Sequence, residues 1–194
     1  DYLSKNIEII RGWLEFNMII YLQKRNPSVP GIADKLYPPM ERKLEKVKKY
    51  WKKIMTLTDV YEIYGGNLLQ SNDVSIDHFV PWSYVAHDEF WNLHPTTRSI
   101  NSSKSNHLPE WDRYFDKLVA QEYKAYELMW KYDEIKKEFN TVAREHINDE
   151  NIRFQLYDKR DLSITTFGNQ LESIVLPVYK SAKNCGFSDW KLEI

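Results

Sequence analysis

Apolar residues recur with helical spacing over most of the chain. Residues 8–27 (EIIRGWLEFNMIIYLQKRNP) predict a helix that ends before Pro27. Residues 26–39 contain four prolines and predict a loop or a short helical turn. Residues 40–55 predict a second helix, in which Pro39 suits the first turn and apolar residues recur at steps of four and three. This apolar stripe consists of Met40, Leu44, Val47, Trp51 and Ile54.

Residues 59–100 have a different pattern. Short apolar runs are broken by Gly-Gly, by Ser-Asn-Asp and by proline, which predicts a small hairpin with a long excursion between its two strands. Helical spacing returns after Pro109, and a last helix should end at Gly186, with Pro177 as a kink or a break. The stripes of these two helices are Trp111, Phe115, Val119, Tyr123, Tyr126 and Trp130, and Ile164, Phe167, Leu171, Ile174, Val178 and Ala182.

The order of these elements predicts an α+β protein that is mainly helical. We expect an N-terminal helical region at 1–58, a small β-containing unit at 59–109 and a C-terminal helical region at 110–194, packed as one compact unit. A chain of 194 residues is long enough to bury a sizeable core. Seven tryptophans and thirteen tyrosines indicate an ordered protein rather than a disordered one.

Composition also bears on the cellular setting. We find no apolar run long enough to span a membrane and no signal peptide. The single cysteine, Cys185, excludes an internal disulfide framework and suits a reducing compartment, so we expect a cytoplasmic protein. The first residue is Asp1, which leaves open a processed chain or a fragment of a longer one.

The net charge is −1, so the strongly basic balance of many nucleic-acid-binding proteins is absent. Basic residues nevertheless cluster between Arg42 and Lys53, with Glu45 as the one acidic residue among them. This cluster is either a solvated helix face or a surface for the DNA backbone. On the second interpretation, phosphates contact Lys46, Lys49 and Lys53.

Residues 75–109 concentrate polar groups that suit metal-assisted phosphodiester cleavage. Hard cations take oxygen ligands, and Asp77 offers a carboxylate and Asn101 an amide oxygen. His78 is a candidate base for the attacking water. Because neighbouring strand residues point to opposite faces, Asp77 and His78 can serve one site only if the strand ends or twists there. Asn92 can hold His78 or its backbone in place.

These residues, in the runs "DHFVP", "NLHPTTRSIN" and "NSSKSN", resemble the HNH, or ββα-metal (His-Me finger), endonucleases. The positions that carry the resemblance are Asp77, His78, Asn92, Asn101 and Lys104. The step from Asn92 to Asn101 and the following S-S-K also resemble the HNH domain of RNA-guided CRISPR nucleases. The likeness covers about residues 62–109. The whole chain is similar to bacterial HNH endonuclease-domain proteins with helical flanks.

The resemblance implies a central ββα-metal finger and hydrolysis of DNA, most plainly duplex DNA, with one catalytic Mg²⁺ or Mn²⁺. It assigns the metal to Asp77 and Asn101, water activation to His78, orientation of that histidine to Asn92 and phosphate charge to Lys104. The products would carry 5′-phosphate and 3′-hydroxyl ends. Arg98 could also contact phosphate, although a solvated surface charge is an equal alternative.

Many members of this family hold a structural zinc with two cysteine pairs. Here the corresponding positions are Glu62, Gly65, Thr97 and Ile100, so the resemblance implies that this zinc is lost. We expect aromatic packing to replace it as the local core, around Tyr64, Trp82, Trp91 and Trp111.

Two alternatives stay open at this level. One is an RNA-directed or nonspecific nuclease of the toxin type, and the other is a catalytically silent DNA-binding or scaffold module with the same fold. The remaining histidines fit a structural role better than a catalytic one, with His94 and His107 as secondary candidates for phosphate contact; they are His87, His94, His107 and His146. The target, the kind of cut, the oligomeric state and the biological role are not indicated.

Overall fold

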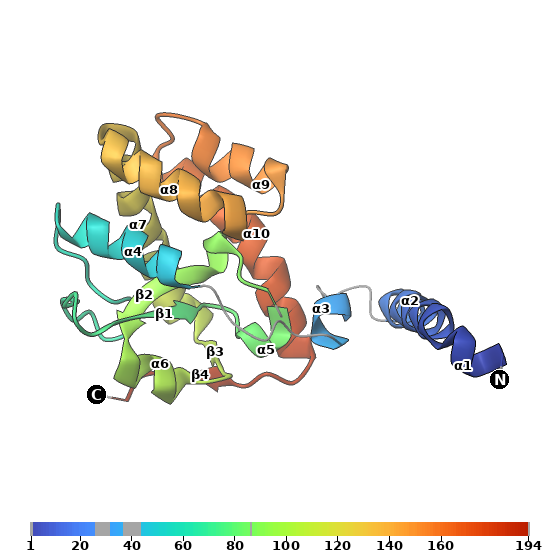
Figure 1. Ribbon diagram of the computed structural model, residues 1–194. Coiled ribbons are helices and arrows are strands. Elements are labelled where there is room, and N and C mark those ends of the chain that lie inside the picture. The colour runs from blue at the N-terminus through green and yellow to red at the C-terminus, as the bar shows by residue number, and fades with distance from the viewer. Residues whose placement is uncertain (1, 26–31, 37–43, 86, 194) are drawn as a thin grey trace.

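The computed structural model describes residues 2–25, 32–36, 44–85 and 87–193. At the N-terminus, the short α1 (Tyr2–Lys5) is followed by α2 (Ile7–Arg25), which confirms the first predicted helix. Figure 1 shows α1 and α2 extending away from the rest of the fold. Because α2 buries none of its residues, large side chains such as Trp13 and Phe16 are exposed at 64% and 62%. A short helix, α3 (Ile32–Leu36), lies within the proline-rich segment.

The basic segment forms α4 (Glu45–Met55), whose apolar stripe faces the core as predicted. Val47, Trp51 and Ile54 are buried, and Leu44 packs against the core at its edge. The predicted positions of Met40 and Pro39 lie outside the described residues.

The predicted hairpin consists of β1 (Val74–His78) and β2 (Leu93–Thr97), which pair antiparallel with Asp77 opposite His94. The excursion between them contains α5 (Trp82–Val85) and the 3₁₀-helix η1 (Phe90–Asn92). Helix α6 (Arg98–Lys104) follows β2 directly, because the Thr97 hydroxyl caps it by accepting from the N–H of Ile100. The result is a ββα unit, whose helix α6 lies at the lower edge of the fold in Figure 1.

The C-terminal region is helical, as predicted. It contains α7 (Trp111–Lys131), α8 (Asp133–His146), α9 (Glu150–Arg153), the π-helix η2 (Phe154–Asp158) and α10 (Ile164–Asn184).

Helix α10 continues through Pro177, so the proline does not break it. Gly186 has a φ of 94° and follows the helix, which confirms the predicted stop. The predicted stripe is partly wrong, since Ile164 is 47% exposed while Val175 and Tyr179 are buried. In the second half of α10, the buried residues Val175 and Tyr179 each lie one position after the predicted Ile174 and Val178.

The ββα unit is embedded in these helices. After it, β3 (Leu108–Pro109) pairs in parallel with β4 (Asp189–Trp190). The Tyr64 ring makes edge contacts with Tyr114 and Trp190, both at 5.1 Å between ring centroids. Phe79, just after β1, packs against aromatic rings of α7 and α10, namely Trp111, Phe115 and Tyr179. This packing supports the expected aromatic core at Tyr64 and Trp111, which one series of ring contacts joins through His94 and Phe79.

One hydrophobic core runs through α4, the hairpin, α7, α8 and α10. The fold is α+β and mainly helical, as the sequence predicts. Across the described ranges, no helix is both long enough and apolar enough to cross a membrane.

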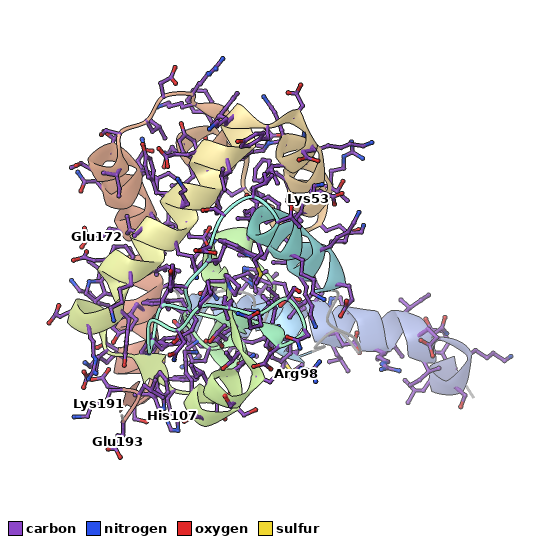
Figure 2. All side chains as sticks on the ribbon, turned by 90° about the vertical axis from the view of Figure 1, so that its left-hand side faces the viewer. Lys53, Arg98, His107, Glu172, Lys191 and Glu193 are labelled. Atoms are coloured by element: carbon purple, nitrogen blue, oxygen red, sulfur yellow. The ribbon has the colours of Figure 1, made fainter. Side chains whose placement is uncertain are left out.

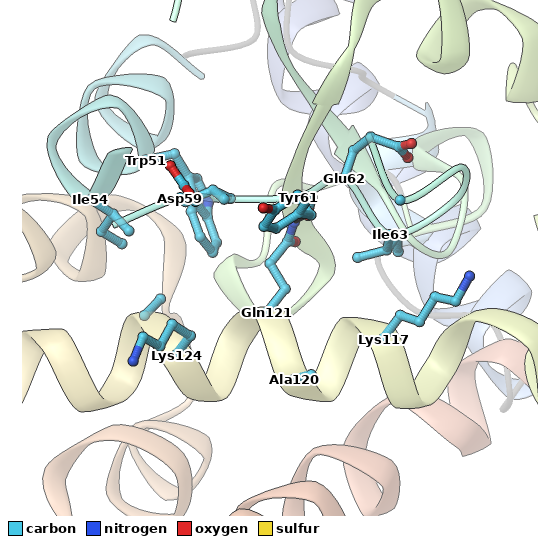
Figure 3. A pocket seen from close by; sticks show the side chains of 13 residues that line it. Trp51, Ile54, Asp59, Tyr61, Glu62, Ile63, Lys117, Ala120, Gln121 and Lys124 are labelled. Carbon is cyan, nitrogen blue, oxygen red and sulfur yellow. Dashed lines mark hydrogen bonds between the residues drawn. The ribbon is translucent and has the colours of Figure 1, made fainter. Parts of the chain in front are cut away.

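A mainly apolar cavity lies between α4, α7 and residues 59–66, as Figure 3 shows. Its wall includes Trp51, Ile54 and Gln121, and none of the predicted catalytic or metal-binding residues lines it.

Candidate functional site

Asp77 lies near the end of β1, and both oxygens of its carboxylate have polar partners. Oδ2 accepts from the Tyr64 hydroxyl at 2.8 Å and lies 3.6 Å from His94 Nε2, while Oδ1 accepts from the backbone N–H of His78 at 2.8 Å. The Lys104 ammonium lies 3.3 Å from Oδ1 and 3.2 Å from Oδ2. Strand pairing explains the His94 contact, because His94 lies directly opposite Asp77 on β2.

These partners determine the charge of the carboxylate. Burial alone would raise the pKa of Asp77, but Lys104, His94 and the Tyr64 hydroxyl outweigh burial and hold that pKa well below its usual range. Burial lowers the pKa of Lys104, and Asp77 opposes that shift. Burial and the neighbouring Asp77 raise the pKa of Tyr64 well above its usual value. Asp77 is therefore an anion at neutral pH.

Lys104 connects the helix of the ββα unit to its first strand. Its side chain is fully buried, and besides Asp77 it donates to the backbone carbonyl of His78 at 2.7 Å. The sequence placed Lys104 at a phosphate, whereas the structure places its ammonium against Asp77. The predicted phosphate role therefore requires the ammonium to leave or share this position, and it stays a prediction.

His78 is the last residue of β1, so the strand ends where the sequence argument required it to. Nε2 of its imidazole lies 2.7 Å from Asp88 Oδ1. Asp88 belongs to the excursion between α5 and η1 and was not among the predicted site residues.

Asn92 is fully buried and clamps the backbone just after His78. Its side-chain oxygen accepts from the N–H of Val80 at 2.7 Å, and its amide nitrogen donates to the carbonyl of Val80 at 2.9 Å. Its own carbonyl accepts from the N–H of Phe79. The structure thus places Asn92 on the backbone that follows His78, and not on the imidazole.

Asn101 lies on α6 above the first strand. Its amide nitrogen donates to Ser75 Oγ at 2.9 Å and to the carbonyl of Ile76 at 3.1 Å, which directs the amide oxygen away from those acceptors. An anionic carboxylate and an amide oxygen are donors that Mg²⁺ and Mn²⁺ accept, and Mg²⁺ needs few protein oxygens. Asp77 and Asn101 therefore fit such an ion by donor type, although Lys104 competes for the carboxylate.

The turn at residues 62–67 stands where the family carries its first cysteine pair, and here Glu62 organises it. The Glu62 carboxylate accepts from the backbone N–H groups of Tyr64, Gly65 and Asn67 at 2.7, 2.8 and 3.1 Å. It also accepts from the side-chain amide of Asn67. With its lone pairs used by the turn, Glu62 is a poor candidate for a metal ligand.

The other three positions of the lost zinc site have structural uses as well. A side chain at Gly65 would put its Cβ 2.8 Å from Glu62 Oε1, so the carboxylate fills the space that a second ligand would need. Thr97 caps α6, and Ile100 is buried in the core. These four residues do not fit a structural zinc. In the described part of the chain, no group of three or more His, Cys, Asp or Glu side chains is placed to hold a metal ion.

The lysines assigned to DNA face α8 and pair with its glutamates. Lys49 lies 2.9 Å from Glu138, Lys53 lies 2.7 Å from Glu134, and Lys46 pairs with Glu145. The three lysines are partly exposed, so salt and water screen these pairs. The pairing neutralises the charges that the sequence assigned to phosphates, and the DNA contact stays a prediction.

Arg98 is exposed at the first position of α6, which is compatible with either of its two interpretations. Figure 2 shows Arg98 and Lys53 at separate places on the surface. His94 is fully buried beside Tyr64 and Asp77, so it supports the site from within. His107 is exposed and bonds Ser188 Oγ, while His146 is buried against the excursion.

Sequence reasoning did not name Asp88, gave Tyr64 only a packing role, and offered His94 only for phosphate contact and not as a partner of Asp77. The pairing of β1 with β2 could have predicted His94, given the correct register. The run "AHDEFWN" contains Asp88, but the contact of Asp88 with His78 depends on the path of the excursion, which no local sequence pattern specifies.

Residues 62–110 match the model of a family described as HNH endonuclease. This segment contains the hairpin, α6 and all of the candidate catalytic and metal-binding residues. No curated protein and no solved structure matches the chain.

Proposed function

Since this chain carries an HNH endonuclease domain, we propose that it hydrolyses DNA phosphodiester bonds with the help of a divalent cation. The observation that carries the proposal is the ββα unit, in which Asp77 and His78 end β1. From α6, Lys104 contacts both of them, and Asn101 contacts the preceding strand residues Ser75 and Ile76.

The residues divide into distinct roles. Asp77 and Asn101 would hold Mg²⁺ or Mn²⁺, which supplies a Lewis acid for the scissile phosphate when bound. His78 takes the proton of the attacking water. Asn92 fixes the backbone after His78, so that the end of β1 keeps its shape.

The cationic groups have a secondary part in this proposal. Arg98 and Lys104 offset the negative charge of the phosphate. Lys104 can do so once its ammonium is shared between Asp77 and the substrate. We place the substrate as duplex DNA, which the family pattern favours over RNA.

A catalytically silent binding module is the second candidate, and one observation favours it. Lys104 and Tyr64 already satisfy the carboxylate that the metal would need. In that case the ion pair would be a purely structural element of the finger, and no cation would be required for binding DNA.

A plasmid assay separates the candidates. Supercoiled DNA is incubated with the protein in Mg²⁺, Mn²⁺ or EDTA, with His78→Ala as the inactive control. We expect nicking or linearisation that depends on the metal and is lost in the variant. Binding without cleavage in any metal would favour the silent module, and preferential cleavage of RNA or single strands would favour the toxin-type nuclease.

A further inference from the structure

The imidazole of His78 is paired with an acid that lies outside the expected set of catalytic residues. Asp88 Oδ1 lies 2.7 Å from His78 Nε2, and the two side chains are only 13% and 5% exposed. A contact this short between nearly buried groups is a strong, charge-assisted hydrogen bond.

The position of Asp88 is fixed by residues far away in the sequence. The backbone carbonyl of Asp88 accepts from Nδ1 of His146, at the end of α8, at 2.9 Å. The neighbouring Glu89 accepts from the side chain of Asn148 at 2.9 Å, and its carbonyl accepts from the N–H of Asn92. The C-terminal helical region therefore anchors the segment that meets His78.

The pairing has a chemical consequence for the ring. An ionised carboxylate only accepts hydrogen bonds, so a neutral His78 must carry its proton on Nε2 to make this contact. The lone pair is then on Nδ1, which becomes the ring atom that can take a proton from water. The carboxylate also holds the plane of the ring in one orientation.

We propose that Asp88 is a positioning residue for His78, which selects the Nε2-protonated tautomer and directs Nδ1 toward the attacking water. This inference rests on the proposed nuclease function. It makes Asp88 act through His78, and not on the metal or the DNA.

Kinetics of Asp88→Ala, with the isosteric Asp88→Asn as a second variant, test this role. We expect kcat for plasmid nicking to fall about 10- to 100-fold, the usual cost of losing a group that orients a catalytic residue. KM should stay close to that of the wild type, and the variants should stay folded, with a melting temperature that Asp88→Ala lowers by a few degrees because His78 loses a nearly buried partner. Asp73→Ala is the matched control, because Asp73 is an exposed aspartate just before β1.

Two further measurements separate positioning from a merely structural role. In a His78→Ala background, Asp88→Ala should cause no additional loss, because residues that act as a unit are not additive. Nitrogen-15 NMR of labelled histidines should show His78 as one tautomer with a slowly exchanging Nε2 proton, and that protection should disappear in Asp88→Ala.

The failures are distinguishable. Wild-type kcat in both Asp88 variants, alongside an inactive His78→Ala, would overturn the positioning role and leave the nuclease intact. An additive loss in the double variant, or a His78 ring protonated on Nδ1, would also overturn it. A wild-type protein that nicks nothing in any metal would overturn the nuclease function and, with it, this role.

Discussion

Replacing Glu62 with alanine should destabilise the fold through the turn that this carboxylate closes. Glu62 is only 1% exposed and accepts from three backbone N–H groups, those of Tyr64, Gly65 and Asn67. Alanine offers no acceptor, so all three donors lose their partner. The N–H of Tyr64 is buried, whereas those of Gly65 and Asn67 are only part-buried and can turn to water.

An unsatisfied buried donor costs about 1–3 kcal/mol, and a resolvated donor costs less. One full penalty and two partial ones lower the free energy of unfolding by about 2–4 kcal/mol. For a chain of this length, that corresponds to a melting temperature lower by about 4–16 °C. Glu62→Gln keeps one acceptor oxygen but turns an NH₂ group toward a donor, so it should lose about half as much.

Thermal and urea unfolding followed by circular dichroism at pH 7 would measure both changes. Glu193→Ala is the control, since Glu193 is exposed and such surface changes stay within about 0.5 kcal/mol. If Glu62→Ala melted within 2 °C or so of the control, the carboxylate would not be what closes this turn.

Other measurements address the metal, the site and the charges. Elemental analysis should find no stoichiometric structural zinc, and a tightly held zinc would contradict this. In calorimetric titrations with uncleavable DNA, Asp77→Ala should lose divalent-metal affinity and Asn101→Ala should lose less of it. His78→Ala should keep the metal affinity, while its cleavage rate should fall on the order of a hundred- to ten-thousand-fold. The opposite pattern would exchange the roles of ligand and base. If Lys46, Lys49 and Lys53 contact phosphates, replacing all three with glutamine should make the log–log salt slope of DNA binding flatter by about 2.7, whereas an unchanged slope would leave them only as partners of the α8 glutamates. The pKa of Asp77 in the folded protein lies below its unfolded value of about 3.9. The ionised carboxylate therefore contributes its full stability above that pH, and this contribution is lost as the pH falls further. Asp77→Asn should be less stable than the wild type at pH 7, and its free energy of unfolding in urea should depend less on pH between about pH 5 and 2.

The sequence predicts the ββα unit well because its signals are local. The polar end of β1 and the Gly-Gly break are each encoded within a few residues. The order of Asp77, His78, Asn92 and Asn101 then follows the strands and the helix. The helices with one apolar stripe were predicted for the same reason, since packing imposes their period.

The contacts that the sequence did not predict all join distant segments. The path of Asp88 toward His78 depends on His146, which follows 58 residues later. Lys46 and Lys49 on α4 pair with glutamates of α8 that lie 99 and 89 residues away in the sequence. The basic face of α4 therefore forms ion pairs with a neighbouring helix. A local pattern shows the charge of a side chain but not the helix that packs beside it.

The embedding of the ββα unit among the helices limits how this fold can be engineered. Residues 62–110 would not serve as a portable cassette, because the ring of Tyr64 packs on Tyr114 and Trp190 and β3 pairs with β4. Excision at the family boundary would strip these aromatic surfaces and expose them to water. A chimera that grafts the ββα unit onto another protein must therefore carry α7 and β4 with it, and the fusion joint belongs outside both.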